Sequence, residues 1–289
     1  MLYKFFSVNN NSLSALSDSS LWFSKILDFN DPFEGQIKII NGGVTRTETI
    51  KIIEGIHAGL VLGNLFTEKE LELYLIEIAK KISDGAEDEF KNYIIEMSKG
   101  AFHEVSDRYH KGGVCCFSSD INENGDYNEP LKNKLMWGHY ADGLRGFSLK
   151  FNDDIFLDLN KNSMNESISG PYEIKYVNDY PCIDLIELSK MTFLEKNLKL
   201  AEDYINKLIT SKNEDWKYEN EYRYLSSAGG KLFKFNPNSI ELICIGNKMK
   251  EENKKRVISI ANRLGVKEIL EAKLDSESYS IKLHQYNEK

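Results

Sequence analysis

The segment from Trp216 to Tyr224 constrains the fold more than any other part of the chain. Its sequence, WKYENEYRY, alternates charged residues with aromatic ones except at Asn220. Because successive side chains of a β-strand point to opposite faces of the sheet, a strand here has one ionic and one aromatic face. A helix would scatter the aromatic residues around its axis. We therefore predict a strand over 216–224. The residues on its ionic face are Lys217, Glu219, Glu221 and Arg223.

The composition indicates an ordinary globular protein. Of its 289 residues, 41% are hydrophobic, which is enough for a sizeable core. The formal net charge of −8 argues against a broadly basic surface that coats nucleic acid. No segment approaches the roughly 20 apolar residues of a membrane span, and the first residues form no long apolar signal core. We therefore expect a cytoplasmic protein with no membrane partner.

Hydrophobic periodicity predicts a sheet with a helical insertion. Alternating and apolar runs predict strands near the start of the chain and after residue 112, whereas helical spacing predicts three helices between about 45 and 110. Helical spacing also predicts one long amphipathic helix over Leu185–Leu208. We predict one α+β domain over residues 1–289 with a mixed, mainly antiparallel sheet. The segments expected to form the sheet are 1–35 and 112–283.

Two further segments concentrate polar and aromatic side chains beside tight turns. In FNDPFEG (29–35) the proline extends the residue before it, and the glycine permits a positive φ. In LMWGHYADGLRGF (135–147) glycine breaks surround hydrogen-bonding side chains of the kind that line ligand pockets. We predict that these two segments and the ionic strand form one site. Its candidate residues are Asn30, Asp31, Glu34, Trp137, His139, Tyr140, Glu219, Glu221 and Arg223.

A purely structural interpretation of the same two segments stays open. Asn30 and Asp31 are residue types that cap turns, and the aromatic side chains on either side of them would anchor the loop to the core. Trp137 and Tyr140 would likewise be buried, with His139 bonded to the backbone. In that case the glycines mark only the turns between elements.

Four motifs occur in the order found in one known family. They are FNDPFE, CFS, MWGHYAD followed by GF, and WKYENEYR. On these motifs the chain resembles the bacterial domain of unknown function 2971 family over roughly residues 1–246. The resemblance implies a bacterial cytoplasmic protein with relatives among phage-defence genes, and it implies no particular reaction.

The Glu-x-Glu sequence at 219–221 is similar to a strand of some ADP-ribosyltransferases, which use NAD. The similarity implies that Glu221 acts on the ribose and that Glu219 activates the substrate. Such enzymes also need a polar residue on an early strand, a position that Tyr3 or Lys4 would have to occupy. Our leading hypothesis is an ADP-ribosyltransferase-like defence or toxin effector that binds NAD and modifies an unidentified protein or nucleic acid.

This hypothesis assigns roles to the candidate residues and requires no metal. We expect a Glu221→Gln variant to lose activity and keep its fold, because glutamine preserves the shape of the side chain and removes its charge. The catalytic candidates are Glu221, Glu219 and His139. The ligand-binding candidates are Asn30, Asp31, Glu34, Trp137, Tyr140 and Arg223.

Two alternative functions use the same residues. In the first, a metal-dependent nucleic-acid-processing enzyme, acidic side chains bind Mg²⁺ and Arg223 or Lys217 binds phosphate. The second is a non-catalytic sensor or interaction module, in which the charged residues form a buried ionic network. The acidic residues of the metal alternative are Asp31, Glu34, Glu219 and Glu221.

Overall fold

The computed structural model describes residues 1–62, 67–122, 125–156 and 167–287. The segments 63–66, 123–124, 157–166 and 288–289, and the predictions that fall on them, lie outside the described residues. Within the described part, no helix is both long and apolar enough to cross a membrane.

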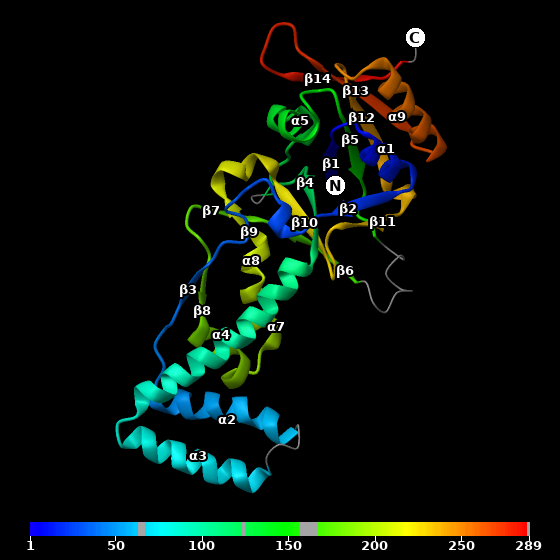
Figure 1. Ribbon diagram of the computed structural model, residues 1–289. Coiled ribbons are helices and arrows are strands. Elements are labelled where there is room, and N and C mark those ends of the chain that lie inside the picture. Colours follow the sequence, from blue (N-terminus) through cyan, green and yellow to red (C-terminus); the bar gives the residue numbers. More distant parts are fainter. Residues whose placement is uncertain (63–66, 123–124, 157–166, 288–289) are drawn as a thin grey trace. The chain divides into compact units, whose positions relative to one another are not determined.

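The chain forms two compact units, which we call the sheet unit and the helical unit. Each unit is assembled from segments that are distant in the sequence (Figure 1). The sheet unit contains residues 1–34, 110–178 and 212–289. The helical unit contains residues 35–109 and 179–211.

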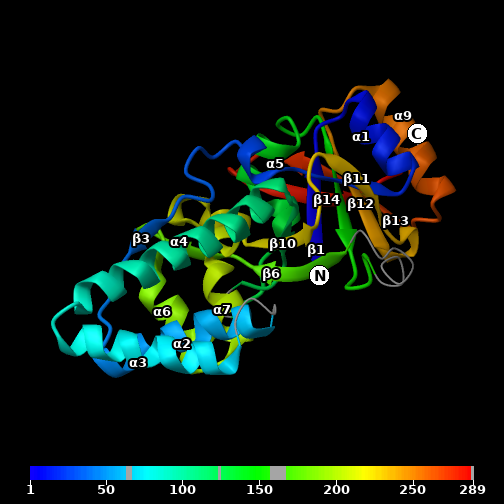
Figure 2. The same ribbon diagram turned by 60° about the horizontal axis from the view of Figure 1, so that its bottom comes forward.

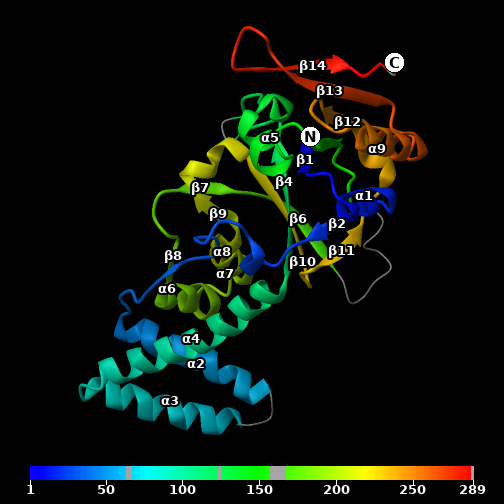
Figure 3. The same cartoon turned by 45° about the horizontal axis from the view of Figure 1, so that its top comes forward.

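A mixed, mainly antiparallel sheet forms the centre of the sheet unit, which confirms the predicted α+β class. In the described residues eight strands lie side by side, and every neighbouring pair is antiparallel except β12 and β13. The strands β13 and β14 form one edge of the sheet (Figure 3). In spatial order the strands are β14 (Ile281–Gln285), β13 (Glu268–Leu274), β12 (Ile240–Gly246), β5 (Phe147–Phe151), β1 (Leu2–Phe6), β4 (Gly113–Ser119), β10 (Glu221–Ser226) and β6 (Ile168–Glu173).

Shorter elements complete the sheet unit. The helices α1 and α9 lie side by side (Figure 2), and α9 connects the parallel strands β12 and β13. The strands β6 and β7 are separated at Ile174, whose backbone N–H donates to the carbonyl of Glu221. These elements are α1 (Asn10–Ser17), β2 (Ser20–Phe23), α5 (Lys134–Tyr140), β7 (Lys175–Val177), β9 (Ser211–Asn213), β11 (Lys231–Lys234) and α9 (Glu251–Arg263).

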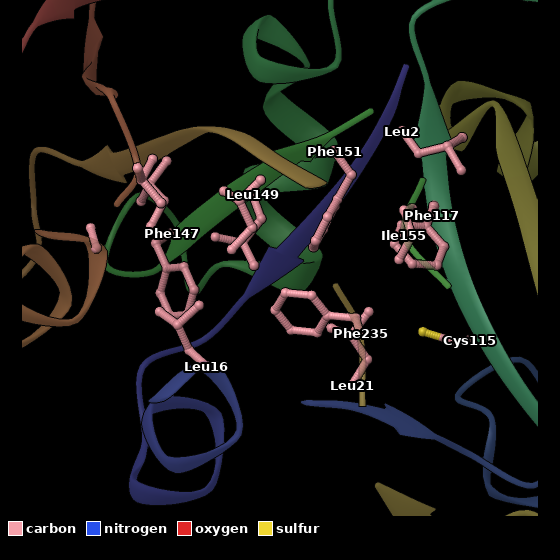
Figure 4. Packing of buried hydrophobic residues seen from close by; sticks show 14 of the residues in the cluster. Leu2, Leu16, Leu21, Cys115, Phe117, Phe147, Leu149, Phe151, Ile155 and Phe235 are labelled. Atoms are coloured by element: carbon pink, nitrogen blue, oxygen red, sulfur yellow. The ribbon is translucent and has the colours of Figure 1, made fainter. Parts of the chain in front are cut away.

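One core packs against the sheet face that α1 and α9 cover. Phe147, Leu149 and Phe151 alternate along β5, so all three point to this face, where Figure 4 shows them in a row. Leu16 of α1 and Val257 of α9 belong to the same cluster. Fully burying a side chain of this size contributes about 1.5–3 kcal/mol, so this layer is a large share of what stabilises the sheet.

The opposite sheet face carries a second core, which fixes α5. The alternate residues of β1, Tyr3 and Phe5, point to this side. Trp137 of α5 is 1% exposed and lies edge-on to Phe5, with ring centroids 5.3 Å apart. Its Nε1 donates to the carbonyl of Leu131 at 2.7 Å. Because both faces of β1 are buried, the residues near this strand are held firmly in place.

The helical unit contains the three helices predicted between 45 and 110. Thr67 caps the second of them through a capping box with Glu70. A short parallel pair of strands, β3 and β8, also belongs to this unit. The elements up to β8 are β3 (Lys38–Ile40), α2 (Arg46–Leu62), α3 (Glu68–Ser83), α4 (Glu87–Lys111) and β8 (Cys182–Asp184).

The prediction of one long helix over Leu185–Leu208 is wrong. Lys196 adopts a positive φ of 52°, and the side chain of Asn197 accepts a hydrogen bond from the N–H of Leu200 to begin a new helix. Apolar residues recur at helical spacing on both sides of this break, so the spacing alone does not reveal it. The observed elements are α6 (Leu185–Ser189), a π-helical turn (Lys190–Leu194), α7 (Leu198–Ile205) and α8 (Lys207–Thr210).

We expect a Gly146→Ala substitution to destabilise the sheet unit by about 1–3 kcal/mol, the usual cost of overpacking. A Cβ atom at Gly146 would lie 2.0 Å from the backbone oxygen of Phe6, so the backbone would have to shift. Gly138→Ala is the matched control, since nothing lies within 4 Å of a Cβ there and alanine favours the helix α5. Urea unfolding of both variants measures the difference. Equal stabilities would contradict the close approach at Gly146.

Candidate functional site

A left-handed turn at Asn220 shapes the segment that we predicted as a strand over 216–224. The chain forms a 3₁₀ helix over Glu214–Glu219, Asn220 has φ 45° and ψ 57°, and only β10 from Glu221 onward is extended. The first half of the strand prediction is therefore wrong. Asparagine tolerates this conformation better than most residues, and the Asn220 side chain also donates to the carbonyls of Ser119 and Ile121.

The turn at Asn220 directs the carboxylates of Glu219 and Glu221 toward the same buried lysine. The Nζ atom of Lys212, in β9, lies 2.5 Å from Oε2 of Glu219 and 2.8 Å from Oε2 of Glu221. All three side chains are buried. The hydroxyl of Tyr140 donates to Oε1 of Glu219. A single ammonium group therefore holds both carboxylates of the Glu-x-Glu sequence.

A second buried cation, Arg223, extends this ionic network. It is the next residue after Glu221 on the same face of β10. Arg223 is 0% exposed, and its Nε donates to Oε1 of Glu221 at 2.6 Å. Its Nη2 lies 2.7 Å from Oε1 of Glu34. The guanidinium carbon also lies 5.4 Å from the ring centroid of Phe29, within the range of a cation–π contact. The loop 29–34 is thus tied to β10.

The two carboxylates differ in proton affinity. Burial raises the pKa of Glu219 to about 7, an effect that the charge of Lys212 only partly offsets. Burial also acts on Glu221, but the charges of Arg223 and Lys212 outweigh it and hold the pKa of Glu221 well below its ordinary value. Near neutral pH, Glu221 is therefore ionised while Glu219 exchanges its proton readily.

These groups border a cavity of about 410 Å³. This size falls within the roughly 300–1,000 Å³ of small-molecule sites. Five of the nine predicted site residues line the cavity, and they come from the 26–30 turn, from α5 and from the segment that ends in β10. They are Asn30, His139, Tyr140, Glu219 and Glu221.

The other four predicted residues do not line this cavity. Glu34 and Arg223 form the buried ion pair behind it. Asp31 is buried and accepts the N–H of Phe33 at 2.9 Å, so it caps its own turn. Trp137 belongs to the core, as described above. For Asp31 and Trp137 the geometry therefore fits the structural interpretation of the two loops.

Two lysines also line the cavity: sequence reasoning missed Lys212 and named Lys4 only as one of two residues for the early-strand position. Lys212 bridges the carboxylates, and the sequence around it carries no periodic signal that separates it from a surface lysine. Lys4, on β1, donates to the carbonyl of Cys116 at 2.8 Å and lies 5.3 Å from the ring centroid of Phe117. In the described part of the chain, no carboxylate forms an ion pair with Lys4.

The acidic residues of the site are not arranged as a metal site. Across residues 1–62, 67–122, 125–156 and 167–287, no group of three or more His, Cys, Asp or Glu side chains has a geometry that could hold a metal ion. Glu34 and Glu219 instead face Arg223 and Lys212.

Comparison with known proteins places part of this site in a family. Residues 136–224 match the family model described as protein of unknown function DUF2971. The match covers less than half of the chain and shows that this segment is similar to the DUF2971 family. The match confirms the resemblance inferred from the motifs, and the DUF2971 segment contains His139, Tyr140, Lys212, Glu219 and Glu221. No curated protein and no solved structure matches the chain.

Proposed function

We propose that the sheet unit is an ADP-ribosyltransferase-like enzyme that consumes NAD in the cavity beside Glu219. One observation carries the proposal: Lys4 of β1 and the two glutamates on either side of Asn220, at the start of β10, line one cavity. The similarity to ADP-ribosyltransferases requires a polar residue of an early strand close to the Glu-x-Glu carboxylates. It does not predict which strands are neighbours. Lys4 is the polar residue on the early strand, Glu221 is the carboxylate on the late strand, and Glu219 lies just before that strand at the end of the 3₁₀ helix.

The proposed reaction transfers ADP-ribose from NAD to a nucleophile on the target. The bond between C1′ of the ribose and the nicotinamide nitrogen breaks, and nicotinamide leaves with the electron pair of that bond. The attacking oxygen or nitrogen bonds to C1′, and its proton passes to the carboxylate of Glu219. A base with a pKa of about 7 suits this transfer at neutral pH.

The remaining residues of the cavity have roles that follow from their charge and shape. Glu221 stays ionised, so its negative charge favours the positive charge that develops on the ribose. Lys212 touches both glutamates and positions them. The rings of Phe29 and Tyr140 line the cavity and offer faces on which nicotinamide can stack. Lys4 offers a positive charge to the phosphates of NAD.

A Glu219→Gln variant is expected to release nicotinamide from NAD at least about 100-fold more slowly than the wild type, the usual contribution of a general base. Glutamine keeps the shape of the side chain and cannot accept the proton. Labelled NAD, purified protein and total cell extract are incubated together, and both nicotinamide release and label transfer are measured. Transferred label then identifies the target as protein or nucleic acid.

Glu252→Gln is the matched control for this assay. Glu252 is exposed in the first turn of α9, so the same chemical change there should leave the rate unchanged. If wild-type protein turns over no NAD in any extract, or if Glu219→Gln retains full activity, the proposed reaction is wrong.

The second candidate, a non-catalytic module, is favoured by one specific observation. Glu34 and Glu221 each face a buried cation, and such pairing accounts for buried charges without any reaction. Under this alternative, NAD would neither be consumed nor raise the melting temperature. NAD that stabilises the protein and is not consumed would instead indicate a sensor.

A further inference from the structure

The helical unit contains a cavity of about 680 Å³ that is separate from the Glu219 site. Its lining residues come from α2, α4, α6, the π-helical turn and α7, all within this one unit. Most of them are apolar, including Ile56, Phe102, Leu188, Phe193 and Leu198. The cavity is therefore a partly open space between helices, and its walls are mostly apolar side chains.

The hydroxyl groups of the lining are already bonded within the protein. The Oγ atoms of Ser98 and Ser189 lie 2.6 Å apart, and Thr192 Oγ1 donates to a backbone carbonyl at 2.8 Å. The hydroxyl of Tyr109 donates to Oδ1 of Asn206 at 2.5 Å. Water in a cavity needs two to four polar partners, and the donor protons of these hydroxyl groups are already used within the protein. The lining therefore favours an apolar occupant over ordered water.

Charge and exposed apolar surface both lie at the rim of this cavity. Arg108 and Glu202 line it and are exposed, so their charged ends remain in water. Met97 is 46% exposed and Leu198 is 68% exposed, although both side chains border the cavity. Removing such large apolar side chains from water is favourable in free energy. An occupant should therefore place its apolar body inside and any polar group at the rim.

The backbone around the cavity is also unusual. The π-helical turn Lys190–Leu194 places Thr192 and Phe193 against it. Short π-helical segments within helices occur frequently at functional sites, because they widen a helix and redirect its side chains. Here the widened turn lies directly against the apolar space.

From these observations we propose that the helical unit binds one apolar small molecule in this cavity. An apolar cavity of about 150 Å³ binds benzene, so a space of about 680 Å³ fits a molecule several times larger. A long aliphatic chain or a fused aromatic system, uncharged over its buried part, has the required chemistry. This proposal is independent of the proposed reaction with NAD, because it concerns a different unit.

Titration of the full-length protein with the neutral dye Nile red tests this site. We expect saturable binding of one dye per chain, and displacement of the dye by 1-dodecanol. Ala101→Phe adds a ring to the lining from α4 and should weaken dye binding at least tenfold. Glu104→Phe is the matched control, because it adds the same ring to an exposed position of α4 outside the lining. The control should bind as the wild type does.

A second measurement tests the site in the wild type, without a substitution that fills the cavity. With ¹³C-methyl methionine, addition of 1-dodecanol should shift the resonance of Met97, which lines the cavity, and leave that of Met249, buried in the core of the sheet unit, unchanged. Absence of saturable binding, equal dye affinity of a folded Ala101→Phe variant, or an unmoved Met97 resonance would overturn the proposal.

Discussion

Replacing Arg223 with methionine is expected to lower the free energy of unfolding of the sheet unit by about 3–5 kcal/mol. Arg223 is fully buried, and its guanidinium group faces the carboxylates of Glu34 and Glu221 at 2.7 and 2.6 Å. Methionine fits the apolar part of the space and leaves Glu34 buried without its cation. Glu221 keeps Lys212.

Urea unfolding followed by tryptophan fluorescence measures this loss. The three tryptophans of the chain, Trp22, Trp137 and Trp216, all lie in the sheet unit, so the signal reports that unit alone. Arg256→Met is the matched control, because Arg256 is exposed on α9. Surface substitutions of this kind usually change stability by less than about 0.5 kcal/mol. A loss as small for Arg223→Met as for Arg256→Met would show that the network does not stabilise the fold.

A double mutant separates the ion pair from the packing of Arg223. In Arg223→Met/Glu34→Gln the carboxylate that lost its partner is also removed. Its total loss should therefore be smaller than the sum of the two single losses by about 0.5–3 kcal/mol, the range for side chains in contact. Strict additivity would mean that Arg223 and Glu34 do not interact.

The same network changes our expectation for Glu221→Gln. From the sequence we expected this variant to keep its fold, because only a charge is removed. In the structure the charge of Glu221 is buried between Lys212 and Arg223, so its removal leaves two cations without a full partner. A loss of stability should accompany any loss of activity, and Glu219→Gln is the cleaner probe of the reaction.

Local patterns predicted most of the sheet because they report which side chains face a core. Alternating and apolar runs after residue 112 became strands such as β5 and β12, and helical spacing between 45 and 110 became α2, α3 and α4. The same patterns failed where one residue interrupts an otherwise regular run. Lys196 and Asn220 adopt positive φ, and the regular pattern resumes beyond each of them.

The candidate site was harder to predict, because its chemistry depends on which strands become neighbours. The glutamates were visible in the Glu-x-Glu sequence, whereas Lys212 looks like any exposed lysine until β9 places it against them. Likewise, Trp137 and Tyr140 are three positions apart on α5, yet one enters the core and the other lines the cavity. Sequence spacing narrows the candidates, and burial decides between them.

Raising the pH from about 4.5 to 7 is expected to destabilise the wild type relative to Glu219→Gln by about 3 kcal/mol. The pKa of Glu219 is raised from an ordinary value of 4.5 to about 7 in the folded protein. Between these values the unfolded chain releases the proton that the folded protein retains. Unfolding therefore releases protons, and a higher pH favours it.

The sign of this effect distinguishes Glu219 from Glu221. The stability that protonated Glu219 provides is fully present below pH 4.5 and is lost by about pH 7. Glu221, whose pKa is lowered, acts in the opposite direction, and its contribution is lost only as the pH falls below 4.5. Glu219→Gln resembles the protonated side chain, so the two proteins should be about equally stable near pH 4.5 and diverge above it.

Urea unfolding at half-unit steps from pH 4.5 to 8 measures this divergence, with Glu252→Gln as the matched control on the exposed surface of α9. The slope for Glu219→Gln relative to the wild type cannot exceed about 1.4 kcal/mol per pH unit for one proton. A variant that instead becomes less stable than the wild type as the pH rises would show that Lys212 stabilises an ionised Glu219. In that case Glu219 would be a fixed charge of the ionic network, and the proposal that it acts as the base would be wrong.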